Sequence, residues 1–168
     1  VDAMEFFFRE VCDVIRRRRA DVRVQIVGHS PPPVIECLAE RPGVEVTGSV
    51  PEVVPYYDRA TVFIVPLRLG GGTRLKIVEA MAMELPVVST SVGAEGLDIT
   101  PGEDILIADE PHAFAGKVLE LLADRDLRRR IATEGRELAR QYDWRTLTRP
   151  YVDLAEAVVA NRGANGAE

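Results

Sequence analysis

The chain has few of the residues that build metal centres and nucleophilic triads. Its 168 residues include only two cysteines and two histidines, and they contain no HExxH or CxxC motif and no carboxylate cluster with metal-ligand spacing. Neither His29 nor His112 is paired with a serine or cysteine in a nucleophile motif. The sequence therefore lends no support to a metal or triad mechanism, and no metal or other cofactor is expected.

The chain also lacks an excess of positive charge and any long apolar run. Its net charge of −6 argues against nucleic acid or an anionic membrane as a bulk partner. The three phenylalanines at residues 6–8 are too few to form a targeting or membrane segment, so a cytoplasmic location is expected. Cys12 and Cys37 lie in apolar surroundings, and we expect both to be buried free thiols.

Strands and helices alternate along the chain. Valine- and isoleucine-rich strands are predicted within residues 22–28, 44–48, 61–67, 86–91 and 105–109, and the main helices over 1–19, 73–84, 111–123, 126–141 and 144–160. This alternation predicts an α/β fold, a parallel sheet with helices on both faces. We expect one domain over residues 1–160 and a disordered tail over 161–168, where apolar residues are scarce.

Three consecutive glycines, Gly70, Gly71 and Gly72, directly precede the predicted helix of residues 73–84. A helix N-terminus after such a loop offers free N–H groups and a positive dipole end, which suit a phosphate. Arg74 and Lys76 are the candidate catalytic cations that would neutralise the phosphate. Thr73 is expected to contribute its N–H, its side chain serving as the N-cap.

One face of this helix is polar. Gly72, Lys76 and Glu79 share it at positions i, i+4 and i+7, and the Glu79 carboxylate could accept hydrogen bonds from two vicinal hydroxyls. Leu75, Val78 and Ala82 are expected to form the core face. The plainer alternative, an exposed face with a Lys76–Glu79 ion pair worth a few tenths of a kcal/mol, leaves the three glycines unexplained.

Other polar loops also follow predicted strands. Gly28 precedes His29 after one strand, and Gly48 precedes Ser49 and Val50 after the next. Carboxyl ends of parallel strands lie at one edge of a sheet, so we expect these loops and the glycine loop to converge there on a ligand.

Three residues could have a purely structural role instead of contacting a ligand. Gly28 is either a ligand contact or a simple turn, and Glu95 either bonds a sugar or caps a turn. We expect Trp144 to anchor the core at a helix start rather than to serve as a stacking platform for a ligand.

Several segments carry a family resemblance: VTGSV, PYYDRA, VPL, GGGTRLKIVEAMA, PVVSTSVGAEGL, GEDILIAD and YDW. They resemble the C-terminal, nucleotide-sugar-binding domain of bacterial group 1 (family 4) retaining glycosyltransferases, in the exopolysaccharide-type branch. The resemblance implies a Rossmann-like domain that forms half of a GT-B fold, without the family's first strand and its loop. It also implies transfer of a hexosyl group, with retention, from a nucleoside-diphosphate sugar to a glycan or lipid-linked acceptor.

The resemblance also implies residue roles. Glu79 matches the second of two donor-site glutamates and would bind the ribose hydroxyls, whereas Gly71 stands where the first, sugar-contacting glutamate is expected. Val50 would contact the base through its backbone. Glu84 stands where the family usually has a glycine that closes the helix.

The acceptor domain of the family precedes this region, so the isolated chain is expected to be inactive in transfer. The full-length enzyme could associate peripherally with a membrane. Two alternatives stay open: a nucleotide-sugar epimerase of similar fold, and a non-catalytic nucleotide-sugar-binding domain.

Overall fold

Two parallel β-sheets form the centre of the domain. In the computed structural model, which describes residues 1–72 and 74–164, and side chains through residue 157, β1 (Val24–Val27) pairs with β2 (Val44–Gly48). Strand β4 (Val87–Ser89) pairs with β3 (Phe63–Val65) on one side and β5 (Leu106–Ile107) on the other. The prediction is a single sheet; in the described residues no backbone ladder joins β1 to β3, so the sheet is in two parts.

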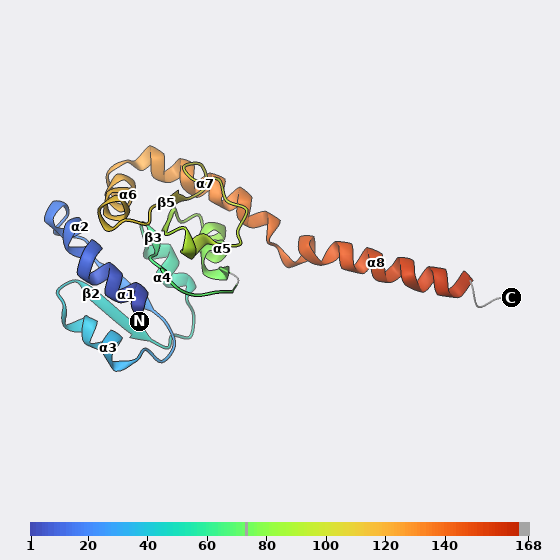
Figure 1. Cartoon of the computed structure of the whole chain (residues 1–168), viewed down its shortest axis with the longest axis horizontal. Helices are drawn as coiled ribbons and strands as arrows, with labels where there is room; N and C mark the ends of the chain where they lie inside the picture. Colours follow the sequence, from blue (N-terminus) through green and yellow to red (C-terminus); the bar gives the residue numbers. More distant parts are fainter. Residues whose placement is uncertain (73, 165–168) are drawn as a thin grey trace.

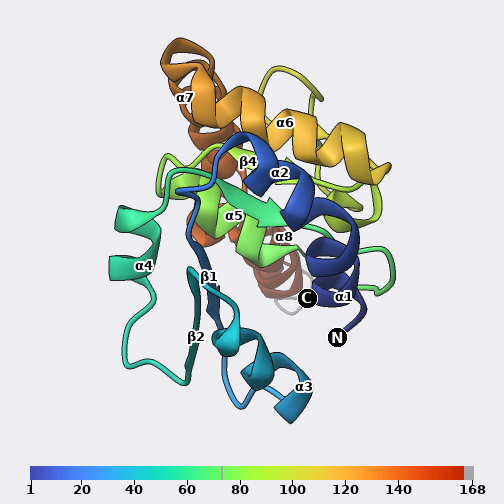
Figure 2. The ribbon, with the colours of Figure 1, turned by 90° about the vertical axis from the view of Figure 1, so that its left-hand side faces the viewer.

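Helices cover both faces of these sheets, as the sequence predicts. The first predicted helix is one continuous segment, α1 (Asp2–Phe6), a π-helical turn η1 (Phe7–Val11) and α2 (Cys12–Arg18). The others are α3 (Pro33–Glu36) with the 3₁₀ turn η2 (Cys37–Glu40), α4 (Val54–Arg59), α5 (Leu75–Ala82), the 3₁₀ turn η3 (Val92–Ala94), α6 (Pro111–Ala123), α7 (Arg125–Gln141) and α8 (Trp144–Ala164). Figure 2 shows β1, β2 and α3 at one end of the domain and α6 and α7 at the other.

Strand β4 separates two hydrophobic clusters because its side chains alternate between faces. Val88 is fully buried on the side of α1, η1, α2 and α6, whereas Val87 is fully buried on the side of α5. Such a strand, buried on both faces, is typical of a parallel sheet between two helical layers.

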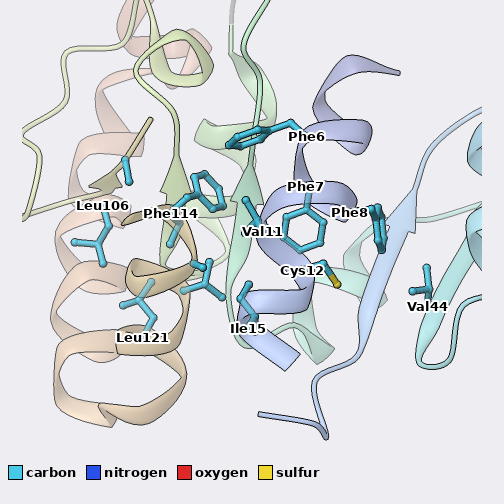
Figure 3. Packing of buried hydrophobic residues seen from close by; sticks show 14 of the residues in the cluster. Phe6, Phe7, Phe8, Val11, Cys12, Ile15, Val44, Leu106, Phe114 and Leu121 are labelled. Carbon is cyan, nitrogen blue, oxygen red and sulfur yellow. The ribbon is translucent and has the colours of Figure 1, made fainter. Parts of the chain in front are cut away.

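The first cluster joins the two sheets under one helical segment. Phe6 meets Phe114 of α6 edge-to-face, with ring centroids 6.2 Å apart. Figure 3 shows Phe8 on the other side of the same segment, on the side of Val44 of β2. Helix α1–α2 therefore holds β1 and β2 to the rest of the domain through side-chain packing.

The predicted core face of α5 is wrong. Ile77, Ala80 and Met81 are buried, whereas Leu75 is 52% exposed. Apolar residues recur at helical spacing on more than one side of α5, and packing against α7 determines which side is buried. There an ideal Cβ on Gly135 would lie only 3.2 Å from Met81 Cγ, so glycine permits the close approach of the two helices.

Two other burial predictions are also wrong. Trp144 is 73% exposed, because α8 projects away from the domain instead of packing on the core (Figure 1). Cys37 is exposed on η2, and only Cys12 is buried. Helix α8 also continues through Ala164, beyond the predicted domain end at residue 160; residues 165–168 of the predicted tail lie outside the described residues.

Helix α5 ends in a left-handed turn at Glu84, whose φ is 55°. The N–H of Glu84 donates to the Met81 carbonyl and that of Leu85 to the Ala80 carbonyl, a Schellman motif that usually has glycine at this position. The Glu84 carboxylate forms an ion pair with Arg136 of α7. This pair gives Glu84 a role between α5 and α7 that the sequence did not predict.

We expect Glu84→Gly to stabilise the domain by about 0.5 kcal/mol. Glycine relieves the left-handed strain of about 1 kcal/mol, and the lost surface ion pair offsets part of that gain. Urea denaturation measures the difference. Glu84→Gln is the matched control, because it removes the charge but keeps the strain; it should be neutral or slightly destabilising. A less stable glycine variant would contradict the argument.

Candidate functional site

The glycine loop leads from β3 to α5 with an open backbone. Gly70 and Gly72 have φ values of 128° and 98°, which favour glycine, and Gly71 and Gly72 have no atom within 4 Å of an ideal Cβ. Gly71 has neither a positive φ nor a crowded neighbour, so a side chain would fit there. Thr73 lies outside the described residues. The loop thus leaves room for a ligand beside its backbone.

Arg74, predicted as a phosphate ligand, is held largely within the protein. Only 8% of its side chain is exposed, and its Nη2 donates to the carbonyls of Gly70 at 2.9 Å and Val92 at 2.8 Å. The guanidinium therefore ties the glycine loop to η3. Its Nε is buried and has no partner among the described residues, so the charge is only partly satisfied by protein.

Lys76 and Glu79 are exposed on the polar face of α5, as predicted. No ion pair joins them in the part of the chain that the structure describes. The plainer alternative of a Lys76–Glu79 pair is therefore not observed. Lys76 leaves its ammonium available for an anion near the start of the helix.

Glu79 is tied to a residue for which the sequence pattern predicts no role. Tyr57 of α4 donates its hydroxyl proton to Glu79 Oε2 at 3.3 Å. Burial and the nearby negative charge of Glu79 raise the pKa of Tyr57 to about 12, so the phenol stays protonated at neutral pH. No local signal distinguishes Tyr57 from Tyr56; only the packing of α4 does.

Glu95 follows η3 and lies near the glycine loop. Its carboxylate is 71% exposed, with Oε2 at 3.8 Å from Arg74 Nη2. The structure thus places Glu95, Arg74 and the glycine loop together.

The loops after β1 and β2 also meet, as predicted. His29 Nδ1 and Ser49 Oγ are hydrogen-bonded at 2.7 Å, next to Gly28 and Val50. Val50 lines an open hollow with Pro51, Glu52, Pro55, Tyr56, Asp58 and Arg59. No hydrogen bond or ion pair joins this group directly to the glycine loop among residues 1–72 and 74–157; the link is α4, which begins beside Val50 and reaches Glu79 through Tyr57.

Metal-ligand clusters and membrane-spanning helices are both absent from the described residues. These residues contain no group of three or more histidine, cysteine, aspartate or glutamate side chains arranged to hold a metal ion. None of their helices is long and apolar enough to cross a membrane.

Parallel strands between two helical layers, with polar loops beyond their carboxyl ends, define a Rossmann-like α/β domain of the GT-B glycosyltransferase type. The family described as "Glycosyl transferases group 1" matches residues 1–124. The chain belongs to this family. The match favours the glycosyltransferase hypothesis over the epimerase alternative.

Curated relatives agree with this membership. An uncharacterised glycosyltransferase of Methanocaldococcus jannaschii is 31% identical over 98 residues, which are 57% of this chain and 28% of that protein. The capsular polysaccharide biosynthesis glycosyltransferase CapM of Staphylococcus aureus is 30% identical over 102 residues, 60% of this chain and 27% of that protein. The chain thus spans less than a third of these relatives.

Solved structures share the fold. The C-terminal domain of the group 1 glycosyl transferase LpcC from Francisella tularensis has a TM-score of 0.67 at 21% identity, covering 81% of this chain and 77% of that one. Anabaena HepE, solved in complex with UDP and glucose, has a TM-score of 0.70 at 18% identity, covering 90% of this chain and 44% of that one.

Proposed function

We propose that this chain binds the nucleoside-diphosphate-sugar donor of a glycosyltransferase. The observation that carries the proposal is the position of the Glu79 carboxylate on the polar face of the helix that the open glycine loop introduces. The loop N–H groups and Lys76 suit a diphosphate, and a carboxylate suits vicinal hydroxyls. A ribonucleoside diphosphate carries both groups.

In this proposal, the other predicted site residues contact the base and the sugar of the donor. The backbone of Val50, in the loops tied by His29 and Ser49, receives the base. Gly28 adjoins that loop, and Glu95 lies toward the sugar. The complex of HepE with UDP and glucose supports a donor of this kind, because HepE shares the fold.

The chemistry requires the electrostatic stabilisation of a departing diphosphate. Helix N–H groups, Lys76 and the partly satisfied charge of Arg74 supply positive potential at this position. No residue of the site requires a metal. Within a full-length enzyme in the cytoplasm, we propose transfer of a hexosyl group, with retention, to a glycan or lipid-linked acceptor held by another domain. The relative CapM is a capsular polysaccharide biosynthesis glycosyltransferase, which supports an exopolysaccharide-type product here. A lipid-linked acceptor would bring the enzyme to a membrane surface.

Calorimetric titration of the chain with uridine, guanosine and adenosine diphosphates tests the proposal. We expect at least one nucleotide to bind more tightly than inorganic pyrophosphate and free glucose, because only the nucleotide reaches the loop, Glu79 and Val50 together. Nucleotides that bind no better than pyrophosphate would contradict the proposal. If a nucleotide binds but the full-length protein transfers no sugar, the non-catalytic alternative holds.

A further inference from the structure

The contact between Tyr57 and Glu79 joins two elements that are far apart in the sequence. Tyr57 belongs to α4 and Glu79 to α5, 22 residues later, and the hydroxyl donates to Oε2 at 3.3 Å. Since α4 begins beside the loop that contains Val50, this bond links the two halves of the proposed site.

The Tyr57 and Glu79 side chains differ in conformational freedom. The Tyr57 ring is partly buried and packs on Phe63 of β3, with ring centroids 5.6 Å apart. Glu79 is exposed and has three rotatable side-chain bonds. A fixed phenol that bonds a mobile carboxylate restricts the carboxylate far more than the reverse.

Tyr56 offers a natural comparison one residue earlier on the same helix. It lines the open hollow, and the Arg59 guanidinium lies 4.9 Å from the centre of its ring. The only side-chain bond from this pair of tyrosines to Glu79 in the described residues comes from Tyr57.

We propose that Tyr57 is a positioning residue that holds the Glu79 carboxylate in the orientation that receives the two ribose hydroxyls of the donor. This inference rests on the proposed function. A carboxylate has about four lone-pair sites, so the bond from Tyr57 leaves enough acceptors for a diol. An oriented side chain also loses less entropy when the ligand binds.

The protonation state of Tyr57 suits this role. The raised pKa, which burial and the Glu79 charge cause, keeps the hydroxyl a donor throughout the neutral range. Glu79 is the charged group that contributes to this shift, and Tyr57 otherwise packs on the Phe63 ring and the apolar cluster that includes it.

The test compares Tyr57→Phe with the matched control Tyr56→Phe. Each is titrated with uridine diphosphate and with 2′,3′-dideoxyuridine diphosphate, or with the corresponding pair for the base that binds best. Phenylalanine keeps the packing on Phe63 and removes only the donor. We expect Tyr57→Phe to weaken ribonucleotide binding about fivefold and to leave dideoxynucleotide binding unchanged. Tyr56→Phe, at a residue that lines the hollow beside Val50, should leave the ratio of the two affinities unchanged.

The Tyr57→Phe substitution made in a Glu79→Ala protein tests whether Tyr57 acts on binding through Glu79. If Tyr57 acts through Glu79, adding Tyr57→Phe to Glu79→Ala should have no further effect. An equal loss for both nucleotides, a loss that persists without Glu79, or no loss at all would overturn the inference. If Tyr57→Phe causes no loss, the Glu79→Ala variant decides whether the proposed function itself fails. A Glu79→Ala protein that binds the ribonucleotide more weakly than wild type would still support the proposed function. A Glu79→Ala protein that binds it as tightly as wild type would contradict the proposed function.

Discussion

Glu79→Ala is expected to weaken binding of a ribonucleoside diphosphate by about 100-fold. The proposed contact comprises two hydrogen bonds to a charged acceptor, each worth about 1.5–3 kcal/mol, and exposure of the carboxylate places the pair toward the lower end of the sum. Every 1.4 kcal/mol corresponds to about a tenfold change in Kd. Calorimetric titration of wild type and variant measures the change.

Three comparisons make this result specific to the ribose. The dideoxynucleotide should bind both proteins with similar affinity, since it lacks the hydroxyls. Glu120→Ala, which removes an equivalent exposed carboxylate from α6, should leave both affinities unchanged. Glu79→Gln should lie between wild type and alanine, because an amide offers one acceptor oxygen and no charge. Equal losses of affinity for the two nucleotides would show that Glu79 does not contact the ribose hydroxyls.

Gly93→Ala is expected to destabilise the domain by about 3 kcal/mol. Gly93 is buried in η3, and an ideal Cβ would lie 2.8 Å from the Val65 carbonyl oxygen and also against Ser89 Oγ. The Val65 oxygen belongs to the end of β3 and cannot move without disturbing the sheet, so the added methyl group overpacks the core. This loss is a large share of the roughly 5–15 kcal/mol that ordinarily stabilises a domain.

Urea denaturation measures the loss, and Gly116→Ala provides the control. Gly116 lies inside α6 with no atom within 4 Å of an ideal Cβ, so alanine there should stabilise the helix by about 0.5–1 kcal/mol. Because η3 also provides the Val92 carbonyl that binds Arg74, Gly93→Ala should in addition disturb the glycine loop. A Gly93→Ala protein as stable as wild type would contradict the close packing.

The strand-end loops show how far sequence patterns reach. The valine-rich strands and the glycines after them predicted that the loops near Gly28 and Val50 would converge with the glycine loop. The His29–Ser49 bond joins the first two loops, but no hydrogen bond among the described residues joins them directly to the glycine loop. The same reasoning could not predict that Arg74 would turn inward. A guanidinium near a glycine loop suits a phosphate and a carbonyl equally well, and the position of η3 decides between them.

The sequence by itself determined the α/β class, the order of the elements and the family of this chain. The class and the order of the elements follow from local periodicity and from glycines and prolines at element ends, which act within a few residues of the chain. The family follows from the motifs that resemble it and from the match over residues 1–124. Only the tertiary structure decided which face of α5 is buried, that Glu84 meets Arg136, and that Tyr57 holds Glu79. Each of these depends on how two separately formed helices pack, and that packing is set by contacts between residues distant in the chain.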